Sequence, residues 1–283
     1  MEIAYINGKY LPKEEITISP DDRGFLFSDG IYEVVRWYKT AFYDIKGHLA
    51  RLKRSLGELK ISWPGNDSFP AIAEKLVKMN DLSDDPAMVY IQVTRGAAPR
   101  THHFPRQETQ PTVYAYAFGF RPNIKEQETG IRVMLKEDIR WSRCDIKSVS
   151  LLANTISFQE AREKGFRECI FSRNGRITEG SHSNIFFVTG NIIFTHPESN
   201  LILPGITRKN IIRIAKDAGM EVREEAIPET SLSLVDEAFI TNTSDEVTPV
   251  TGINGNKIGD GSPGPVSKRM LDLFREETTS LKA

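Results

Sequence analysis

The sequence predicts an α+β fold of two domains. Strand-like and helix-like segments alternate irregularly along its 283 residues, and short hairpins join many of the strands. This arrangement is typical of antiparallel or mixed sheets with helices packed on them, and not of a doubly wound parallel sheet. A polar stretch that contains proline, residues 121–128, follows one complete set of strands and helices. We therefore expect domains at residues 1–120 and 129–283, joined by a linker at residues 121–128.

Composition is that of an ordinary soluble globular protein. Hydrophobic residues make up 39% and charged residues 27%, and the formal net charge is -1. This balance gives no overall field that would favour nucleic acid or an anionic membrane surface. The two cysteines have no paired spacing, and the N-terminus lacks the pattern of a signal peptide. No apolar run nears the ~18 residues of a membrane span. We expect a cytoplasmic protein with no membrane or nucleic-acid partner.

In the first half of the chain, turn signals and amphipathic patterns define the predicted elements. Asn7-Gly8 lies between apolar segments and favours a hairpin, because both residues tolerate positive φ. Residues 25–43 are rich in aromatic and β-branched side chains and predict two strands around a turn near Lys39-Thr40. Apolar periodicity predicts two helices and two further strands. The helices are expected over 45–59 and 69–79, and the strands over 87–95 and 111–120.

The second half shows the same mixture of hairpins and helices. Asn174-Gly175 and Thr189-Gly190 each join two strand-like segments, and Gly165 and Gly219 close helical patterns. Helices are expected over 151–164, 207–218 and 266–281, and strands over 130–135, 168–173, 176–179, 184–188, 191–195 and 238–241.

Lys147 is the candidate for a reactive amine. It follows an extended segment and precedes a helical pattern. Most of the 37 lysines and arginines are expected to be solvated surface charges. Lys147 is therefore a candidate only if other segments supply what a reactive lysine needs. The glycine-rich loops that bind nucleotides, Gly-x-Gly-x-x-Gly and the Walker pattern, are both absent.

Two segments have the composition of an anion site. Gly205-Ile206-Thr207 leads straight into a helical pattern, where exposed amides bind phosphate well and Thr207 is a good N-cap. Residues 241–249 follow an apolar strand and offer four hydroxyls and an amide. Arg51, on the 45–59 helix, would add a charge-assisted bond to phosphate. Each segment also has a purely structural explanation, as a capped helix, a turn with satisfied backbone or a solvated helix face.

An acidic residue and a basic loop complete the candidates. Glu179 ends a strand just before Gly180, and facing a pyridine nitrogen it would hold that nitrogen protonated. The alternative is an exposed acid in a turn. Two prolines bracket a loop with Arg100 and His102, whose guanidinium and imidazole suit a carboxylate, although such loops are usually just solvated. The five histidines and two cysteines lack the spacing of a metal site, so no metal is expected.

Taken together, these motifs resemble the fold-type IV pyridoxal-phosphate aminotransferases, and most closely the bacterial D-amino-acid aminotransferases. The resemblance covers nearly the whole chain. The matching motifs are Asp22-Arg23-Gly24, Asp29-Gly30-Ile31-Tyr32-Glu33-Val34-Val35, His48-Leu49-Ala50-Arg51-Leu52, Val93-Thr94-Arg95-Gly96, Pro99-Arg100-Thr101-His102, Glu137-Asp138-Ile139-Arg140-Trp141, Arg143-Cys144-Asp145-Ile146-Lys147-Ser148, Thr178-Glu179-Gly180-Ser181, Gly205-Ile206-Thr207-Arg208 and Glu246-Val247-Thr248-Pro249-Val250.

The resemblance implies a pyridoxal 5'-phosphate (PLP) cofactor and a role for each candidate. Lys147 would be the catalytic Schiff-base lysine, and Glu179 would pair with the pyridinium nitrogen. The phosphate would be held by Arg51, Ile206, Thr207 and Thr243. The substrate α-carboxylate would be bound by Tyr32, Arg100 and His102.

Two further implications concern the assembly and the departures from the family pattern. In the family, the arginine and histidine of the carboxylate site come from the neighbouring subunit, so a homodimer is implied. His182 and Asn242 stand where close relatives usually carry serine and a hydroxyl residue. Both would touch the cofactor and tune its affinity or the size of the pocket.

The implied reaction is a ping-pong transamination between small molecules. The amino group would pass from a D-amino acid, such as D-alanine or D-glutamate, to a 2-oxo acid, 2-oxoglutarate or pyruvate. Alternatives with the same fold are an L-branched-chain aminotransferase, an amine transaminase and an aminodeoxychorismate-lyase-like enzyme. A non-catalytic small-molecule binder is the alternative outside that class. Substrate handedness separates the enzymes, and a yellow colour of the purified protein separates enzyme from binder.

Overall fold

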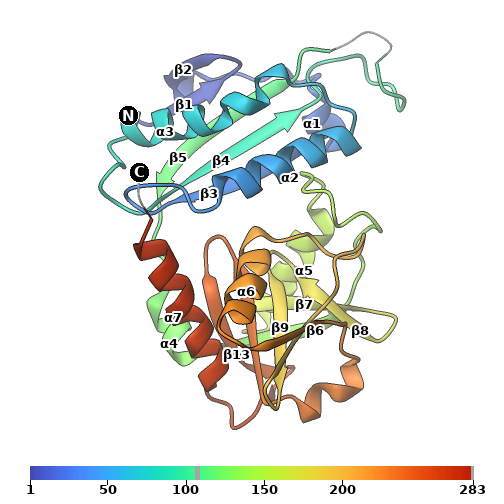
Figure 1. Cartoon of the computed structure of the whole chain (residues 1–283). Coiled ribbons are helices and arrows are strands. Elements are labelled where there is room, and N and C mark those ends of the chain that lie inside the picture. Colours follow the sequence, from blue (N-terminus) through green and yellow to red (C-terminus); the bar gives the residue numbers. More distant parts are fainter. Residues whose placement is uncertain (106–108, 282–283) are drawn as a thin grey trace. The chain divides into compact units, whose positions relative to one another are not determined.

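The computed structural model describes residues 1–105 and 109–281, which form two compact units. The first unit consists of Met1–Arg121, Ile146–Ser150 and Leu281, and the second of Pro122–Asp145 and Leu151–Ser280 (Figure 1). Each unit has its own sheet, its own helices and its own hydrophobic core. The α+β fold class that the sequence predicts is therefore confirmed. Lys147 packs with the first unit, although the segments on both sides of Ile146–Ser150 belong to the second.

An antiparallel sheet forms the centre of the first unit, with the strand order β2-β1-β5-β4-β3. Asn7 and Gly8 join β1 to β2 with φ angles of 44° and 92°. The predicted hairpin is confirmed, and it depends on two residues that accept positive φ. The strands are β1 (Ile3–Ile6), β2 (Lys9–Pro12), β3 (Gly30–Trp37), β4 (Ala87–Thr94) and β5 (Thr112–Gly119).

Helices α2 and α3 cover one face of this sheet (Figure 1). Helix α2 begins after Asp44, whose carboxylate accepts a hydrogen bond from the Gly47 amide at 3.0 Å. Helix α3 buries Ile72 and Leu76 in the core, one turn apart on the same helix face. The helical segments are η1 (Lys13–Glu15), α1 (Arg23–Phe27), α2 (Ile45–Glu58), η2 (Pro64–Ser68) and α3 (Phe69–Met79).

Residues 25–43 differ from the two strands predicted for them. The segment begins in the short helix α1, which Asp22 caps by accepting a hydrogen bond from the Gly24 amide at 2.8 Å. Only Gly30–Trp37 is a strand, and the predicted second strand is reduced to a single bridge at Phe42. A one-turn helix and a single bridge are too short to leave a periodic pattern in the sequence.

A mixed sheet forms the centre of the second unit. Its strands follow the path β11-β10-β9-β12-β13-β6-β7-β8, and β14 pairs with β13. Strand β6 is parallel to both β13 and β7, and β10 is parallel to β11. The strands are β6 (Ile131–Glu137), β7 (Glu168–Arg173), β8 (Arg176–Gly180), β9 (Asn184–Thr189), β10 (Ile192–Thr195), β11 (Glu221–Glu224), β12 (Glu237–Asn242), β13 (Glu246–Ile253) and β14 (Asn256–Lys257).

Helices pack on this sheet at several strands. Helix α7 lies against β12 and β13, and α4 against β13. Helix α6 lies against β11 and β12, and α5 against β6 and β7. Figure 1 labels these four helices. Alternate strand residues form the core, such as Ile185 and Phe187 of β9 and Ala238 and Ile240 of β12. The helical segments are α4 (Ile124–Thr129), α5 (Leu152–Glu163), α6 (Ile206–Asp217), η3 (Glu229–Leu234) and α7 (Pro265–Thr279).

Two polar segments are more regular than the sequence indicates. Within residues 121–128, predicted as a linker, Asn123 caps helix α4 by accepting a hydrogen bond from the Glu126 amide at 3.3 Å. Within residues 241–249, strand β13 begins at Glu246 and pairs with β12 on one side and β6 on the other. The sequence does not predict this central strand, because it contains threonines and Pro249, and proline usually marks loops and edge strands.

Helix α7, with 15 residues, is shorter than the ~20 residues that cross a bilayer. Within residues 1–105 and 109–281, no helix has the length and apolarity of a membrane-spanning segment.

Leu76→Ala is expected to lower the free energy of unfolding by about 2–5 kcal/mol, because truncation leaves a cavity that its neighbours fill only in part. Leu76 is 0% exposed, in the core of the first unit. Met79→Ala is the control on the same helix, at 41% exposure, and is expected to cost less than about 1 kcal/mol. Urea denaturation followed by circular dichroism measures both, and equal losses would contradict the placement of Leu76 in the core.

Candidate active site

Lys147 is held in place by the backbone of strand β3. The Tyr32 amide donates to the Lys147 carbonyl at 3.0 Å, and the Val149 amide donates to the Gly30 carbonyl at 3.0 Å. The Lys147 amide itself donates to Ser55 Oγ of helix α2 at 3.3 Å. The main chain is thus fixed on both sides of the lysine side chain.

The Lys147 amine lies over the ring of Tyr32, with Nζ 4.2 Å from the ring centroid. Among the residues that the structure describes, the amine has no hydrogen-bond acceptor and no carboxylate partner. The side chain is half-buried. A fixed main chain and an amine not engaged by any acid leave this lysine available to react with a ligand.

Arg51 is fixed by a buried carboxylate on strand β3. Glu33 is 0% exposed and accepts hydrogen bonds from Arg51 Nε at 2.7 Å and from Nη2 at 2.9 Å. His48 Nδ1 lies 2.9 Å from Glu33 Oε2. Burial would raise the pKa of Glu33, but Arg51 and His48 hold it far below its ordinary value. Sequence analysis singled out Arg51 and missed the roles of Glu33 and His48, whose only signal was their place in the matching motifs.

Arg100 and His102, predicted to bind a carboxylate, lie together against the ring of Phe27. The guanidinium carbon of Arg100 is 4.8 Å from the Phe27 centroid, and the His102 ring centroid is 5.7 Å from it. Both side chains are exposed. In the described part of the chain, no hydrogen bond, ion pair or ring contact joins either residue to Tyr32. The structure thus brings together two of the three residues predicted for the carboxylate site.

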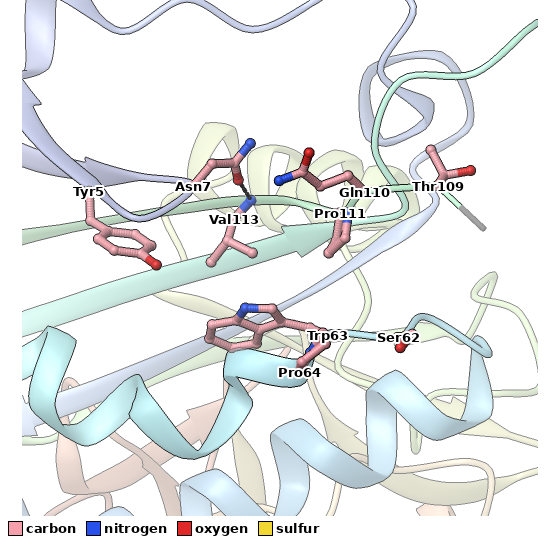
Figure 2. A pocket seen from close by; sticks show the side chains of 9 residues that line it. All are labelled: Tyr5, Asn7, Ser62, Trp63, Pro64, Thr109, Gln110, Pro111 and Val113. Atoms are coloured by element: carbon pink, nitrogen blue, oxygen red, sulfur yellow. Dashed lines mark hydrogen bonds between the residues drawn. The ribbon is translucent and has the colours of Figure 1, made fainter.

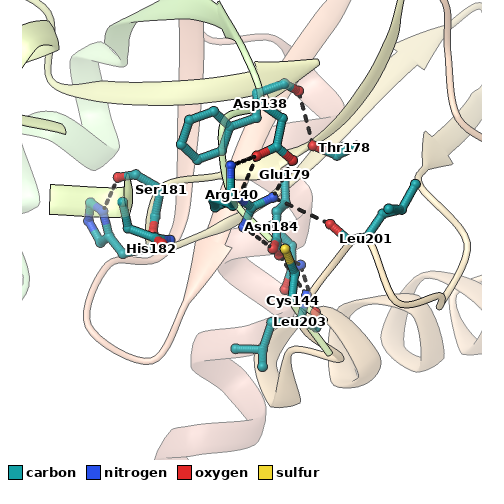
Figure 3. Close-up of polar contacts among 12 residues, drawn as sticks. Asp138, Arg140, Cys144, Thr178, Glu179, Ser181, His182, Asn184, Leu201 and Leu203 are labelled. Atoms are coloured by element: carbon teal, nitrogen blue, oxygen red, sulfur yellow. Dashed lines mark hydrogen bonds and ion pairs between the residues drawn. The ribbon is translucent and has the colours of Figure 1, made fainter. Parts of the chain in front are cut away.

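Glu179, in the second unit, lies at the end of β8 in a buried network (Figure 3). Arg140 Nη1 donates to Glu179 Oε1 at 2.6 Å, and Asn184 Nδ2 and the Leu203 amide each donate to Oε2 at 2.9 Å. Asp138 accepts two further bonds from the Arg140 side chain, at 2.9 and 3.0 Å, and a third from the Arg140 amide at 3.0 Å. Burial raises the pKa of Glu179 to about 7, against the opposing charge of Arg140. At 4% exposure, Glu179 is not a solvated turn acid.

His182 lies on a fully buried carboxylate of the same unit. Its Nδ1 is 2.8 Å from Glu168 Oε2, and its Nε2 is 4.0 Å from Asp245 Oδ2. Loss of water contact would lower the pKa of His182, but Glu168 and Asp245 raise it above its ordinary value. Asn242 Nδ2 donates to the same Asp245 oxygen at 2.9 Å. The two positions that depart from the family pattern therefore face one carboxylate, and Thr243 follows Asn242 in the turn between β12 and β13.

Ile206 and Thr207 are the first two residues of helix α6. Gly205, and not Thr207 as the sequence predicted, is the N-cap, and no side chain caps this helix end. A Cβ atom at Gly205 would come within 2.0 Å of Asn184 Oδ1, so only glycine fits this approach. The amides of the first helical turn have no intrahelical acceptor, and without a cap they are available to an anion.

A pocket of about 460 Å³ in the first unit contains none of the predicted site residues (Figure 2). The rings of Tyr5 and Trp63 and the amides of Asn7 and Gln110 line it, and Asn7 Oδ1 accepts a hydrogen bond from the Val113 amide at 2.7 Å. The described residues that line it include no lysine, histidine or carboxylate. The pocket therefore offers no amine, imidazole or carboxylate among its described lining residues.

At pH 7, Glu33→Gln is expected to lower the free energy of unfolding by about 3–5 kcal/mol, because Arg51 loses its buried counter-charge. A carboxyl whose pKa is lower in the folded state stabilises the fold above its unfolded pKa of about 4.3 and loses that contribution as pH falls. The difference between the two proteins should therefore shrink steadily below about pH 4.3.

Urea denaturation at a series of pH values measures this difference, with Glu14→Gln as an exposed control that should change little. A loss in Glu33→Gln that stays constant from pH 7 to pH 3 would contradict the ion pair.

The chain is similar in sequence to known aminotransferases. The family model described as amino-transferase class IV matches residues 30–253. A D-alanine aminotransferase of Bacillus licheniformis is 40% identical over 275 residues, which cover 97% of this chain and 96% of that protein. A D-alanine aminotransferase of Staphylococcus haemolyticus is 37% identical over 277 residues, 98% of each chain.

Solved structures of aminotransferases superpose on nearly the whole of this chain. The branched-chain amino acid aminotransferase of Escherichia coli superposes with a TM-score of 0.93 at 27% identity, covering 100% of this chain and 96% of that one. The branched-chain amino acid aminotransferase of T.th., in complex with N-(5'-phosphopyridoxyl)-L-glutamate, gives a TM-score of 0.90 at 27% identity, covering 98% of this chain and 94% of the other. The resemblance drawn from the sequence motifs is confirmed, and the chain belongs to the class IV aminotransferases, the fold-type IV family.

Proposed function

We propose that this protein is a PLP-dependent D-amino-acid aminotransferase, which moves the amino group of D-alanine or D-glutamate to 2-oxoglutarate or pyruvate. The observation that carries the proposal is the unengaged amine of Lys147, fixed on β3 over the ring of Tyr32 in a chain of the aminotransferase family. The D-alanine aminotransferases that match at 40% and 37% identity over nearly the full length support the D-amino acid.

Three features of the chain fit PLP. Its aldehyde needs a primary amine that no acid engages, as at Lys147. Its ring nitrogen needs a carboxylate, and three donors occupy Glu179, which has about four acceptor sites and so keeps about one for a ring N–H. Its phosphate needs amide donors and a cation. The groups proposed for the phosphate are the uncapped amides of Ile206 and Thr207, together with Thr243 and Arg51.

Lys147 would hold PLP through its amine, and that amine would serve as general base and acid for the substrate α-proton. When bound, PLP supplies the electron sink for the charge that develops at the substrate α-carbon. Arg140, Asn184 and the Leu203 amide hold the Glu179 carboxylate still, so its orientation is set before a ligand arrives. His182 and Asn242, which share Asp245, are proposed to touch the cofactor from the same unit as Glu179.

Handedness follows from a fixed carboxylate site and a fixed base. With both in place, only one enantiomer presents its α-hydrogen to Lys147. We assign the carboxylate site to Tyr32 of one subunit and Arg100 and His102 of its neighbour, which makes the active form a homodimer. Within the described part of one chain, Arg100 and His102 make no contact with Tyr32. This supports the assignment of the three residues to two subunits.

An L-branched-chain aminotransferase is the second candidate, because the Escherichia coli branched-chain enzyme has a TM-score of 0.93. Its identity of 27% is lower than the 40% of the Bacillus licheniformis D-alanine enzyme. A panel of D- and L-amino acids with 2-oxoglutarate and pyruvate separates the two candidates. Turnover of D-alanine or D-glutamate is expected, and turnover of L-leucine without D-alanine would overturn the proposal.

Lys147→Ala is expected to abolish the visible absorbance band of the purified protein and to lower kcat by about 100- to 10,000-fold, because the base and nucleophile are lost. Lys75→Ala is a matched control, since the Lys75 amine also lies over a tyrosine ring, 4.1 Å from the Tyr10 centroid. The control should keep both band and rate. An unchanged spectrum in Lys147→Ala would remove this lysine from the mechanism.

Arg100→Ala is expected to raise KM for amino acids by about 10- to 100-fold, because one charge-assisted contact to the carboxylate is lost. Cofactor affinity, measured by titration of the visible band, should stay within about twofold of wild type. Arg121→Ala, at a surface ion pair with Asp85, is the control and should leave KM unchanged. Unaltered amino-acid kinetics in Arg100→Ala would show that the carboxylate binds elsewhere.

A further inference from the structure

Phe27 is the last residue of helix α1 and contacts both side chains of the proposed carboxylate clamp, Arg100 and His102. The Arg100 guanidinium carbon lies 4.8 Å from the Phe27 centroid, and the His102 ring meets Phe27 edge to face at 5.7 Å and 61°. The Arg23 guanidinium carbon also lies 4.6 Å from the same centroid. The Phe27 ring is thus in contact with two guanidinium groups and one imidazole.

The backbone between the two clamp residues is held by Arg23. Arg23 Nη1 donates to the Thr101 carbonyl at 2.7 Å, and its Nε donates to Asp29 Oδ2 at 2.8 Å. Arg95 donates to the two oxygens of Asp29 at 2.7 and 2.9 Å. Arg23 is 2% exposed, so this anchor lies inside the protein. Helix α1 therefore fixes both the main chain at Thr101 and the side chains beside it.

A clamp built from exposed, long side chains needs such a support. Arg100 and His102 are both exposed, and a free arginine populates many rotamers that do not match a carboxylate. A guanidinium over an aromatic face keeps its planar edge free to donate while losing part of that freedom. Phe27 is half-buried and is not among the residues of the first unit's core, so packing alone does not account for an aromatic residue there.

We infer that Phe27 is a positioning residue of the substrate-carboxylate site, the platform on which Arg100 and His102 are held in binding geometry, with Arg23 and Asp29 as its anchor. The inference rests on the proposed function, because it assumes that these two residues bind the carboxylate. It gives a role to the segment Asp22-Arg23-Gly24, which matches the family motif but carries none of the proposed reaction steps. Phe27 acts through the clamp residues and does not itself touch the substrate.

The test compares Phe27→Leu with Phe27→Tyr in the full-length holoenzyme. Leucine removes the aromatic face and keeps apolar bulk, so KM for D-alanine and for pyruvate should rise about tenfold, with kcat changing less than about twofold. Tyrosine keeps the ring and should restore KM to within about twofold of wild type. Phe25→Leu, on the same helix at 78% exposure, is the matched control and should leave both constants unchanged.

Two further measurements separate a loss of clamp positioning from a general loss of structure. The visible absorbance and the melting temperature of Phe27→Leu should match those of wild type, since a general loss of structure would lower kcat and cofactor binding as well. Arg100→Ala is assayed in parallel. If Arg100→Ala raises KM and Phe27→Leu does not, the positioning role of Phe27 is overturned and the proposed function stands. The same holds if Phe27→Tyr raises KM as much as Phe27→Leu does. If Arg100→Ala leaves KM unchanged, the clamp and the platform are overturned together.

Discussion

The pairing of Lys147 with strand β3 is the interaction on which the chemistry proposed for the first unit depends. The bond from the Tyr32 amide to the Lys147 carbonyl sets the amine above the Tyr32 ring. Successive side chains of a strand point to opposite faces, so Tyr32 and Glu33 serve different neighbours. Tyr32 faces the Lys147 amine, whereas Glu33 faces helix α2 and holds Arg51. One short strand thereby places the proposed nucleophile, part of the substrate site and the proposed phosphate ligand.

The buried carboxylates Glu33, Glu168 and Glu179 differ in the direction in which their surroundings shift the pKa. Burial would raise the pKa of Glu33 and of Glu168, but Arg51 in one case and His182 in the other lower it below the ordinary value. Glu179 behaves differently, because burial raises its pKa to about 7 and Asp138 adds to that rise. Arg140 lowers the pKa of Glu179, but the same guanidinium also binds Asp138, and burial outweighs it.

The sequence was sufficient for elements whose pattern is local. The hairpin at Asn7-Gly8 and the helices α2 and α3 were predicted because turn chemistry and apolar spacing lie within a few residues of each other. Helix α1 was missed because one turn has no period to detect, and strand β13 was taken for part of a polar segment because its threonines and Pro249 imitate a loop.

The candidate site could be predicted only in part for a similar reason. Lys147, Arg51 and Glu179 lie in motifs that resemble a known family, so their residue types drew attention. The groups that hold two of them in place, Glu33 and Arg140, act through contacts between segments far apart in the chain. No local pattern records such a contact, and only the folded arrangement shows that these two side chains are committed to a partner.

Strand β3 ends the sheet of the first unit, and its outer edge would offer unpaired amides and carbonyls to other chains. Residues Ile146–Ser150 occupy part of that edge through the bridge between Ile31 and Ser148. During synthesis, this cover arrives only after the strands it protects have left the ribosome. Until then this edge of β3 is uncovered, so the segment that carries the proposed catalytic lysine is also the one that closes the edge.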